Sequence, residues 1–249
     1  MNQQRHFRLL TVVVLLIVLL TTALPAFAQT ATPEPLQCDA FQDRATDIRV
    51  GYYMGQGAGF MEAGQYVDAI DSYSCALRID DAYIPAYIHR AIAHTERRDY
   101  ENALKDYTAA LGLDSSQADV LNNRGIVYAA SGDFDKALSD FNDAIGIDSK
   151  YLVAYNNRGI VQTIRGEYDA AIADFKTGLT LDENYAQSYA LIGMVYSQWS
   201  LDNYREYLKL AGDKSDNRIQ AAAESLESRF TFDLRLDDGT WWLEARFED

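Results

Sequence analysis

The sequence predicts an all-α solenoid of stacked helical hairpins, and two ladders of residues carry the prediction. Small residues recur every 34 positions, at Gly57, Ala91, Gly125, Gly159 and Gly193. Alanines recur in the same register, each followed four residues later by an aromatic ring: Ala69 and Tyr73, Ala103 and Tyr107, Ala137 and Phe141, Ala171 and Phe175. A fixed period of this length indicates helical hairpins that bury their apolar faces only by stacking on one another.

The first 28 residues predict a secretory signal peptide. Arg5 and Arg8 precede an apolar run at residues 9–20, and Ala26-Phe27-Ala28 forms a small-x-small cleavage site before Gln29. The alternative is an uncleaved membrane anchor, because residues 9–24 approach the minimum length of a spanning helix. Both interpretations place the rest of the chain outside the cytoplasm, in the periplasm, on the cell surface or secreted.

Residues 29–38 follow as a flexible linker, and this segment ends in one of the two cysteines, Cys38 and Cys75. An even pair in an exported protein favours a disulfide. The alternative is a buried thiol at Cys75 with Cys38 free, since the sequence does not give the distance between them.

The formal net charge is −15 and becomes −17 without residues 1–28, which contain two arginines and no acid. Such a surface is a poor partner for nucleic acid or anionic membrane. Contact with a membrane is expected only if the N-terminal segment stays uncleaved.

Residues 39–211 are the predicted solenoid, with full units at 50–83, 84–117, 118–151 and 152–185. Each unit should contain two antiparallel helices joined near Gly64, Gly132 or Gly166. The small residues of the first ladder would let the two helices approach closely, and the aromatic rings would fill the space beside them.

Arginine and aspartate recur 16 residues apart, as Arg90 with Asp106, Arg124 with Asp140 and Arg158 with Asp174. In the first unit both are replaced, by Gln56 and Ser72. Their joint absence predicts a structural salt bridge between the two helices of one hairpin.

A degenerate fifth unit is expected at 186–211, with Ser200-Leu201-Asp202-Asn203 as its turn and a second helix at about 204–210. Residues 212–229 then read as a capping helix, with Ile219, Ala222, Ala223 and Leu226 on one side.

Residues 230–249 predict a β-hairpin, because apolar and polar residues alternate on both sides of Asp238-Gly239. Closing that turn places Leu236 opposite Trp241 and Leu234 opposite Leu243. An isolated hairpin is marginally stable, so it should cover the capping helix, the end of the solenoid or a partner protein.

The 34-residue units resemble the tetratricopeptide repeat (TPR) family over 50–185. The family usually has a proline after the acid that ends each unit, where this chain has Asp81, Ser115, Ser149 and Glu183. The resemblance implies a right-handed superhelical solenoid that binds a protein or peptide on a concave surface lined mainly by the first helices.

No nucleophile elbow or phosphate-binding loop is present, and His89 and His94 have a poor spacing for one metal ion. We therefore expect no catalytic site, cofactor or metal. His94 also occupies the column of Phe60, Tyr128 and Tyr196, which indicates a packing role.

Projecting the family's register onto the first helices gives the candidate partner-binding residues: Ile88, Ile92, Asn122, Asn123, Ile126, Asn156, Asn157 and Ile160. An asparagine amide both donates to and accepts from an extended backbone, which favours an extended peptide or protein partner. The alternative is that the asparagines serve local capping or solvation. The expected function is a noncatalytic interaction scaffold; the alternative is oligomerisation or envelope-complex assembly through the C-terminal hairpin.

Overall fold

A computed structural model describes residues 38–211, 217–227, 231–237 and 240–246. The predicted signal peptide and all but the last residue of the linker lie outside this part. The chain divides into two compact units, residues 1–39 and 40–249, and the elements below belong to the second. Both cysteines, Cys38 and Cys75, are disulfide-bonded, and neither is a free thiol.

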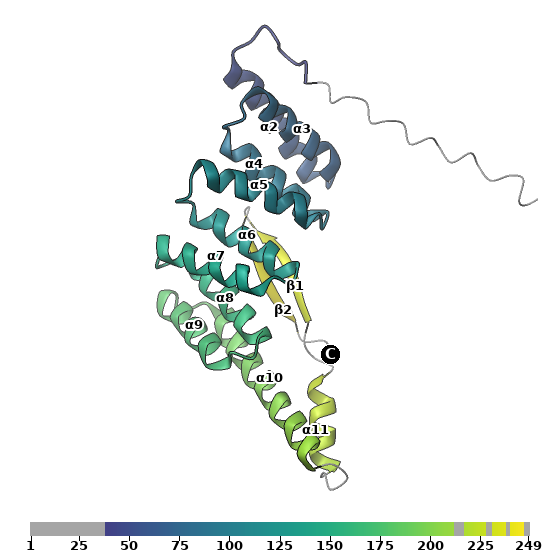
Figure 1. The fold of residues 1–249 in the computed structure, drawn as a ribbon, viewed down its shortest axis with the longest axis vertical. Helices are drawn as coiled ribbons and strands as arrows, with labels where there is room; N and C mark the ends of the chain where they lie inside the picture. The colour runs from purple at the N-terminus through teal and green to yellow at the C-terminus, as the bar shows by residue number, and fades with distance from the viewer. Residues whose placement is uncertain (1–37, 212–216, 228–230, 238–239, 247–249) are drawn as a thin grey trace, which may run out of the picture. The chain divides into compact units, whose positions relative to one another are not determined.

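The 34-residue units fold as paired helices, as predicted (Figure 1). The four hairpins in the described residues are α2 (Thr46–Glu62) with α3 (Tyr66–Ile79), α4 (Ile84–Glu96) with α5 (Tyr100–Leu113), α6 (Ala118–Ala130) with α7 (Phe134–Ile147), and α8 (Leu152–Ile164) with α9 (Tyr168–Leu181). The second helix of each hairpin also contacts the first helix of the next, so the hairpins stack in chain order.

The turns inside the hairpins depend on one left-handed residue each. Gly64, Gly132 and Gly166 have φ values of 70°, 86° and 76°. Arg98 stands at the equivalent position of the second hairpin and has a φ of 58°. A glycine adopts this conformation without strain, whereas an arginine does so at a cost.

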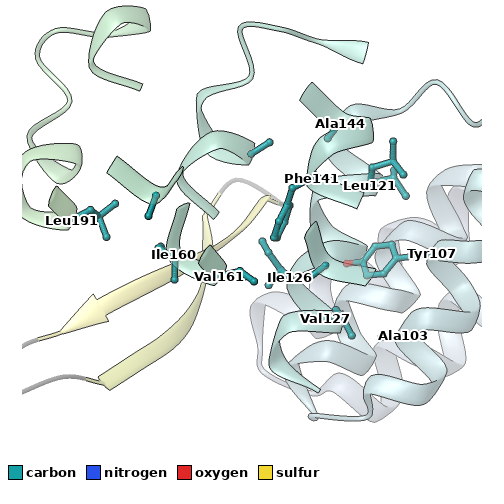
Figure 2. Packing of buried hydrophobic residues seen from close by; sticks show 14 of the residues in the cluster. Ala103, Tyr107, Leu121, Ile126, Val127, Phe141, Ala144, Ile160, Val161 and Leu191 are labelled. Atoms are coloured by element: carbon teal, nitrogen blue, oxygen red, sulfur yellow. The ribbon is translucent and has the colours of Figure 1, made fainter. Parts of the chain in front are cut away.

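The small residues of the first ladder lie where the two helices of a hairpin approach most closely. A Cβ atom added to Gly57 would lie 2.3 Å from the Tyr73 ring, and one added to Gly125 would lie 2.7 Å from the Phe141 ring. Gly159 meets Phe175 in the same way. The rings are themselves buried in the core, which Figure 2 shows around Phe141 and Ile126. Close approach therefore explains these glycines, as predicted.

The three arginine–aspartate pairs form the predicted bridges, and each is bidentate. Arg124 donates from Nε and Nη2 to Asp140, with both distances 2.8 Å, and the other two pairs repeat this geometry. The remaining nitrogen, Nη1, donates to the second helix of the preceding hairpin. Its acceptors are Ser74 for Arg90, Thr108 for Arg124 and Asn142 for Arg158. Each arginine thus connects three helices.

The predicted fifth hairpin is wrong, because α10 runs without interruption from Ala186 to Ala211. No glycine is available at the expected turn, and Ser200 and Asn203 instead bond to helix carbonyls one turn earlier. Leu201 is buried, and Asp202 accepts a hydrogen bond from Tyr168 at the start of α9. These contacts favour continuing the helix over turning back.

Gly193 therefore lacks the structural role that the sequence predicted for it. Unlike Gly57, Gly125 and Gly159, it has open space where a Cβ would be placed, with nothing within 4 Å. The reason is that α10 has no second helix folded back upon it at this position.

The predicted capping helix corresponds to α11 (Asn217–Glu227), which contacts α10. Strands β1 (Thr231–Asp237) and β2 (Thr240–Arg246) then pair antiparallel, with Leu236 opposite Trp241 and Leu234 opposite Leu243. This is the register that the alternation predicts. Strand β2 also contacts α6 and α8.

Within the described part of the chain, no helix combines the length and the apolar character needed to cross a membrane.

Candidate functional site

The candidate binding residues lie on three first helices, α4, α6 and α8. Helices α6 and α8 contact each other directly, although α7 separates them in the sequence. Their adjacent residues form one surface, which we call the α6–α8 face. It consists of Asn122, Asn123, Ile126, Asn157 and Ile160.

The predicted exposure of these residues is wrong. Asn122, Asn123, Asn156 and Asn157 are between 0% and 4% exposed, and Ile92, Ile126 and Ile160 are also buried. Only Ile88 of the candidate set is partly accessible. Helices α6 and α8 contact each other, and β2 contacts both of them. The sequence register placed these residues on the first helices but did not predict that they would be buried.

The asparagines bond across helices rather than capping them. Asn157 Nδ2 donates to Asn122 Oδ1 at 2.9 Å, which joins α8 to α6. Asn122 Nδ2 lies 3.5 Å from Asn123 Oδ1, at the outer limit of a hydrogen bond. Their near-complete burial argues against solvation, and neither Asn122 nor Asn156 is the N-cap of its helix. Buried amides of this kind favour one alignment of α6 with α8.

A contact that the sequence did not indicate extends this polar row to α10. Ser188 Oγ donates to Asn156 Oδ1 at 3.4 Å, and Ser188 is fully buried. A Cβ at Gly178 would lie 3.0 Å from Ser188 Oγ, so α8, α9 and α10 meet closely here. In the sequence this contact is indicated by no more than a small polar residue in a degenerate repeat. Such residues are also common in loops and at helix ends.

The α6–α8 face carries no charged side chain among its five members. Its composition is two isoleucines and three asparagines, and the extended strand β2 contacts both helices that supply them. An apolar surface with amide groups suits an extended chain, whose backbone needs hydrogen-bonding partners and whose alternate side chains need apolar contact.

Helix α4 carries two histidines, of which His94 is partly buried and His89 is more exposed. His89 stacks on Tyr73 with ring centroids 5.6 Å apart, and partial desolvation lowers its pKa from the ordinary 6.5. His94 Nδ1 lies 3.0 Å from Asp99 Oδ2, and burial lowers its pKa too, although Asp106 and Asp99 oppose the shift. In both histidines the shift favours the neutral imidazole.

The charged pairs of the array are structural in their geometry. Burial raises the pKa of Asp140, while hydrogen bonds from Arg124 act in the opposite direction. Both oxygens of this carboxylate accept from the same guanidinium. Across the described ranges, no three His, Cys, Asp or Glu side chains are grouped so that they could hold a metal ion.

Comparisons with known proteins agree with this architecture. Tetratricopeptide repeat models match residues 89–151 and 153–185. A search of curated proteins gives no match.

Several solved structures share the fold. A crystal structure of MamA is 19% identical, with a TM-score of 0.56, and the match covers 72% of this chain and 91% of that one. PilF of Pseudomonas aeruginosa is 21% identical, with a TM-score of 0.56 and coverage of 74% and 90%. A tetratricopeptide repeat protein from Parabacteroides merdae is 20% identical, with a TM-score of 0.56 and coverage of 71% and 72%. Residues 89–151 and 153–185 of this chain are therefore tetratricopeptide repeats.

Proposed function

We propose that this protein is a noncatalytic interaction scaffold that binds an extended peptide or protein on the side formed by α4, α6 and α8. Stacked helical repeats present long continuous surfaces, and repeats of this family serve as scaffolds for protein–protein interaction. The partner contacts would come from first-helix residues, with Ile88 at the accessible edge.

The observation that carries the proposal is the extended strand β2 lying against α6 and α8. An extended segment of the chain thus lies beside two of the helices proposed to bind the partner. An extended partner segment would meet the same isoleucines and asparagine amides, and would gain main-chain hydrogen bonds with little demand on its sequence.

We further propose that the protein acts outside the cytoplasm. The N-terminal 28 residues have the features of a signal peptide, and the disulfide-bonded state of Cys38 and Cys75 fits an oxidising compartment. Intact mass measurement of the protein from its native host should give a chain that begins at Gln29. A mature chain that retains residues 1–28 would support a membrane anchor instead.

The binding side can be tested by photo-crosslinking in the native host, because substituting the buried asparagines would also disturb folding. A photoreactive residue replaces Ile88 on α4 or, as the matched control, Lys105 on the exposed side of α5. The proposal expects a crosslinked partner at position 88 and none at position 105. Equal products at both positions, or a product at 105 alone, would contradict it.

The alternative function, assembly through the C-terminal hairpin, predicts a different product. A crosslink at twice the mass of the chain, lost when residues 230–249 are deleted, would support oligomerisation.

A further inference from the structure

The C-terminal hairpin contacts two of the helices that carry the predicted binding surface. Strand β2 contacts α6 and α8, the two helices that supply all five residues of the α6–α8 face. Those five residues are at most 2% exposed. An external partner therefore cannot reach them while the protein keeps this arrangement.

The hairpin is suited to leaving this position. It is a two-stranded sheet, and such a sheet is marginally stable unless it packs on something else. It follows α11 in the same chain. A segment tethered in this way has an effective concentration on the order of millimolar, so even a weak contact keeps it bound until a competitor arrives.

Building on the function proposed above, we infer that β2 is the intramolecular occupant of the α6–α8 face, and that an extended segment of a partner protein binds there by displacing it. The partner segment has apolar side chains at alternate positions and few charges. Its chemistry follows from a face made of isoleucines and asparagine amides, and from the strand that rests there in the free protein.

The experiment uses full-length protein and a fluorescent synthetic peptide with the sequence of residues 230–249. Leu243→Pro lies in the middle of β2, opposite Leu234, and should open the strand pairing. Thr240→Pro lies at the first residue of β2, where proline is tolerated, and is the matched control. Peptide binding is measured by anisotropy, and far-UV circular dichroism checks that the helices remain folded. Leu234→Pro opens the same pairing from β1 and replaces Leu243→Pro if that variant fails to fold.

The inference expects the peptide to bind Leu243→Pro at least about tenfold more tightly than wild type or Thr240→Pro, since the tethered competitor is removed. The Asn157 side-chain amide should shift in the NMR spectrum when the peptide binds. Equal affinities for the three proteins, or no binding to a folded Leu243→Pro variant, would overturn the inference.

The inference and the proposed function can fail separately. If a partner crosslinks at position 88 equally well in wild type and Leu243→Pro, the scaffold function stands and displacement by the partner is wrong. If the peptide competes as expected but no partner crosslinks at position 88, the hairpin occupies the face and the proposed binding function is wrong.

Discussion

Replacing Gly125 by alanine should destabilise the protein, while the same change at Gly193 should stabilise it. Both glycines lie inside helices at the same position of the 34-residue period. Alanine at either site removes the backbone-entropy penalty of a helical glycine, which is about 1 kcal/mol. The two sites differ in what surrounds the new methyl group.

At Gly125 the added Cβ would lie 2.7 Å from Phe141 Cε1 and 3.2 Å from Asp140 Cβ. The ring of Phe141 is fully buried, and Asp140 is held by two hydrogen bonds, so neither can move without disturbing its neighbours. Overpacking of this kind costs about 1–3 kcal/mol. After the gain in helix propensity, Gly125→Ala should lose up to about 2 kcal/mol of unfolding free energy. At Gly193 nothing lies within 4 Å, so about 1 kcal/mol should be gained.

Urea unfolding followed by circular dichroism measures both changes as shifts of the midpoint, provided the m-value is unchanged. The double variant Gly125→Ala, Phe141→Leu tests the cause, because a smaller side chain should relieve the clash and make the two changes non-additive. If Gly125→Ala is as stable as Gly193→Ala, close helix contact does not explain the glycine ladder.

Three other changes are predicted. Arg98→Gly should raise the unfolding free energy by about 1 kcal/mol, because Arg98 is the one non-glycine residue with a left-handed conformation in the four hairpin turns. Arg97 has a φ of −82° and serves as the control, so a gain of similar size for Arg97→Gly would contradict this. Arg124→Met should lower the unfolding free energy measured in urea by about 3 kcal/mol, because Asp140 remains buried without its partner. Adding Asp140→Leu should recover part of this loss. If it recovers nothing, the packing of the arginine side chain matters rather than the ion pair. The unfolding free energy should be nearly constant between pH 8 and 6.5 and should decrease below pH 6.5, because the unfolded chain then binds protons that folded His89 and His94 exclude. Thermal melting at each pH tests this, and the decrease should be smaller in His89→Phe.

The sequence predicted the repeated part of the fold because a contact that is made in several hairpins leaves a periodic pattern in the sequence. Arg90, Arg124 and Arg158 each occur 16 residues before an aspartate, and each forms the same bridge. Gly193 kept its place in the period but lost its contact, because α10 continues as a helix where a turn was expected. Local sequence could not decide this, since the outcome depends on Leu201 being buried and on Asp202 reaching Tyr168 from the previous hairpin.

The candidate site was predicted less well, for a related reason. Asn157 and Asn122 were placed correctly on first helices, yet their bond to each other joins residues 35 positions apart. The pairing register of β1 with β2 follows from alternation around Asp238-Gly239. The contact of β2 with α6 and α8 joins one unrepeated segment to two repeated ones, and no periodic signal can record it.

The third hydrogen bond of each arginine couples its hairpin to the hairpin before it. Arg90, Arg124 and Arg158 tie their hairpins to the preceding second helix, so three successive junctions are coupled by the same device. At the next junction the equivalent residue is Ile192, and α9 is joined to α10 without such an arginine. In a one-dimensional array, unfolding begins where nearest-neighbour coupling is weakest. Fraying should therefore start at α10 and stop at α9, which would free the C-terminal region while the first four hairpins remain folded.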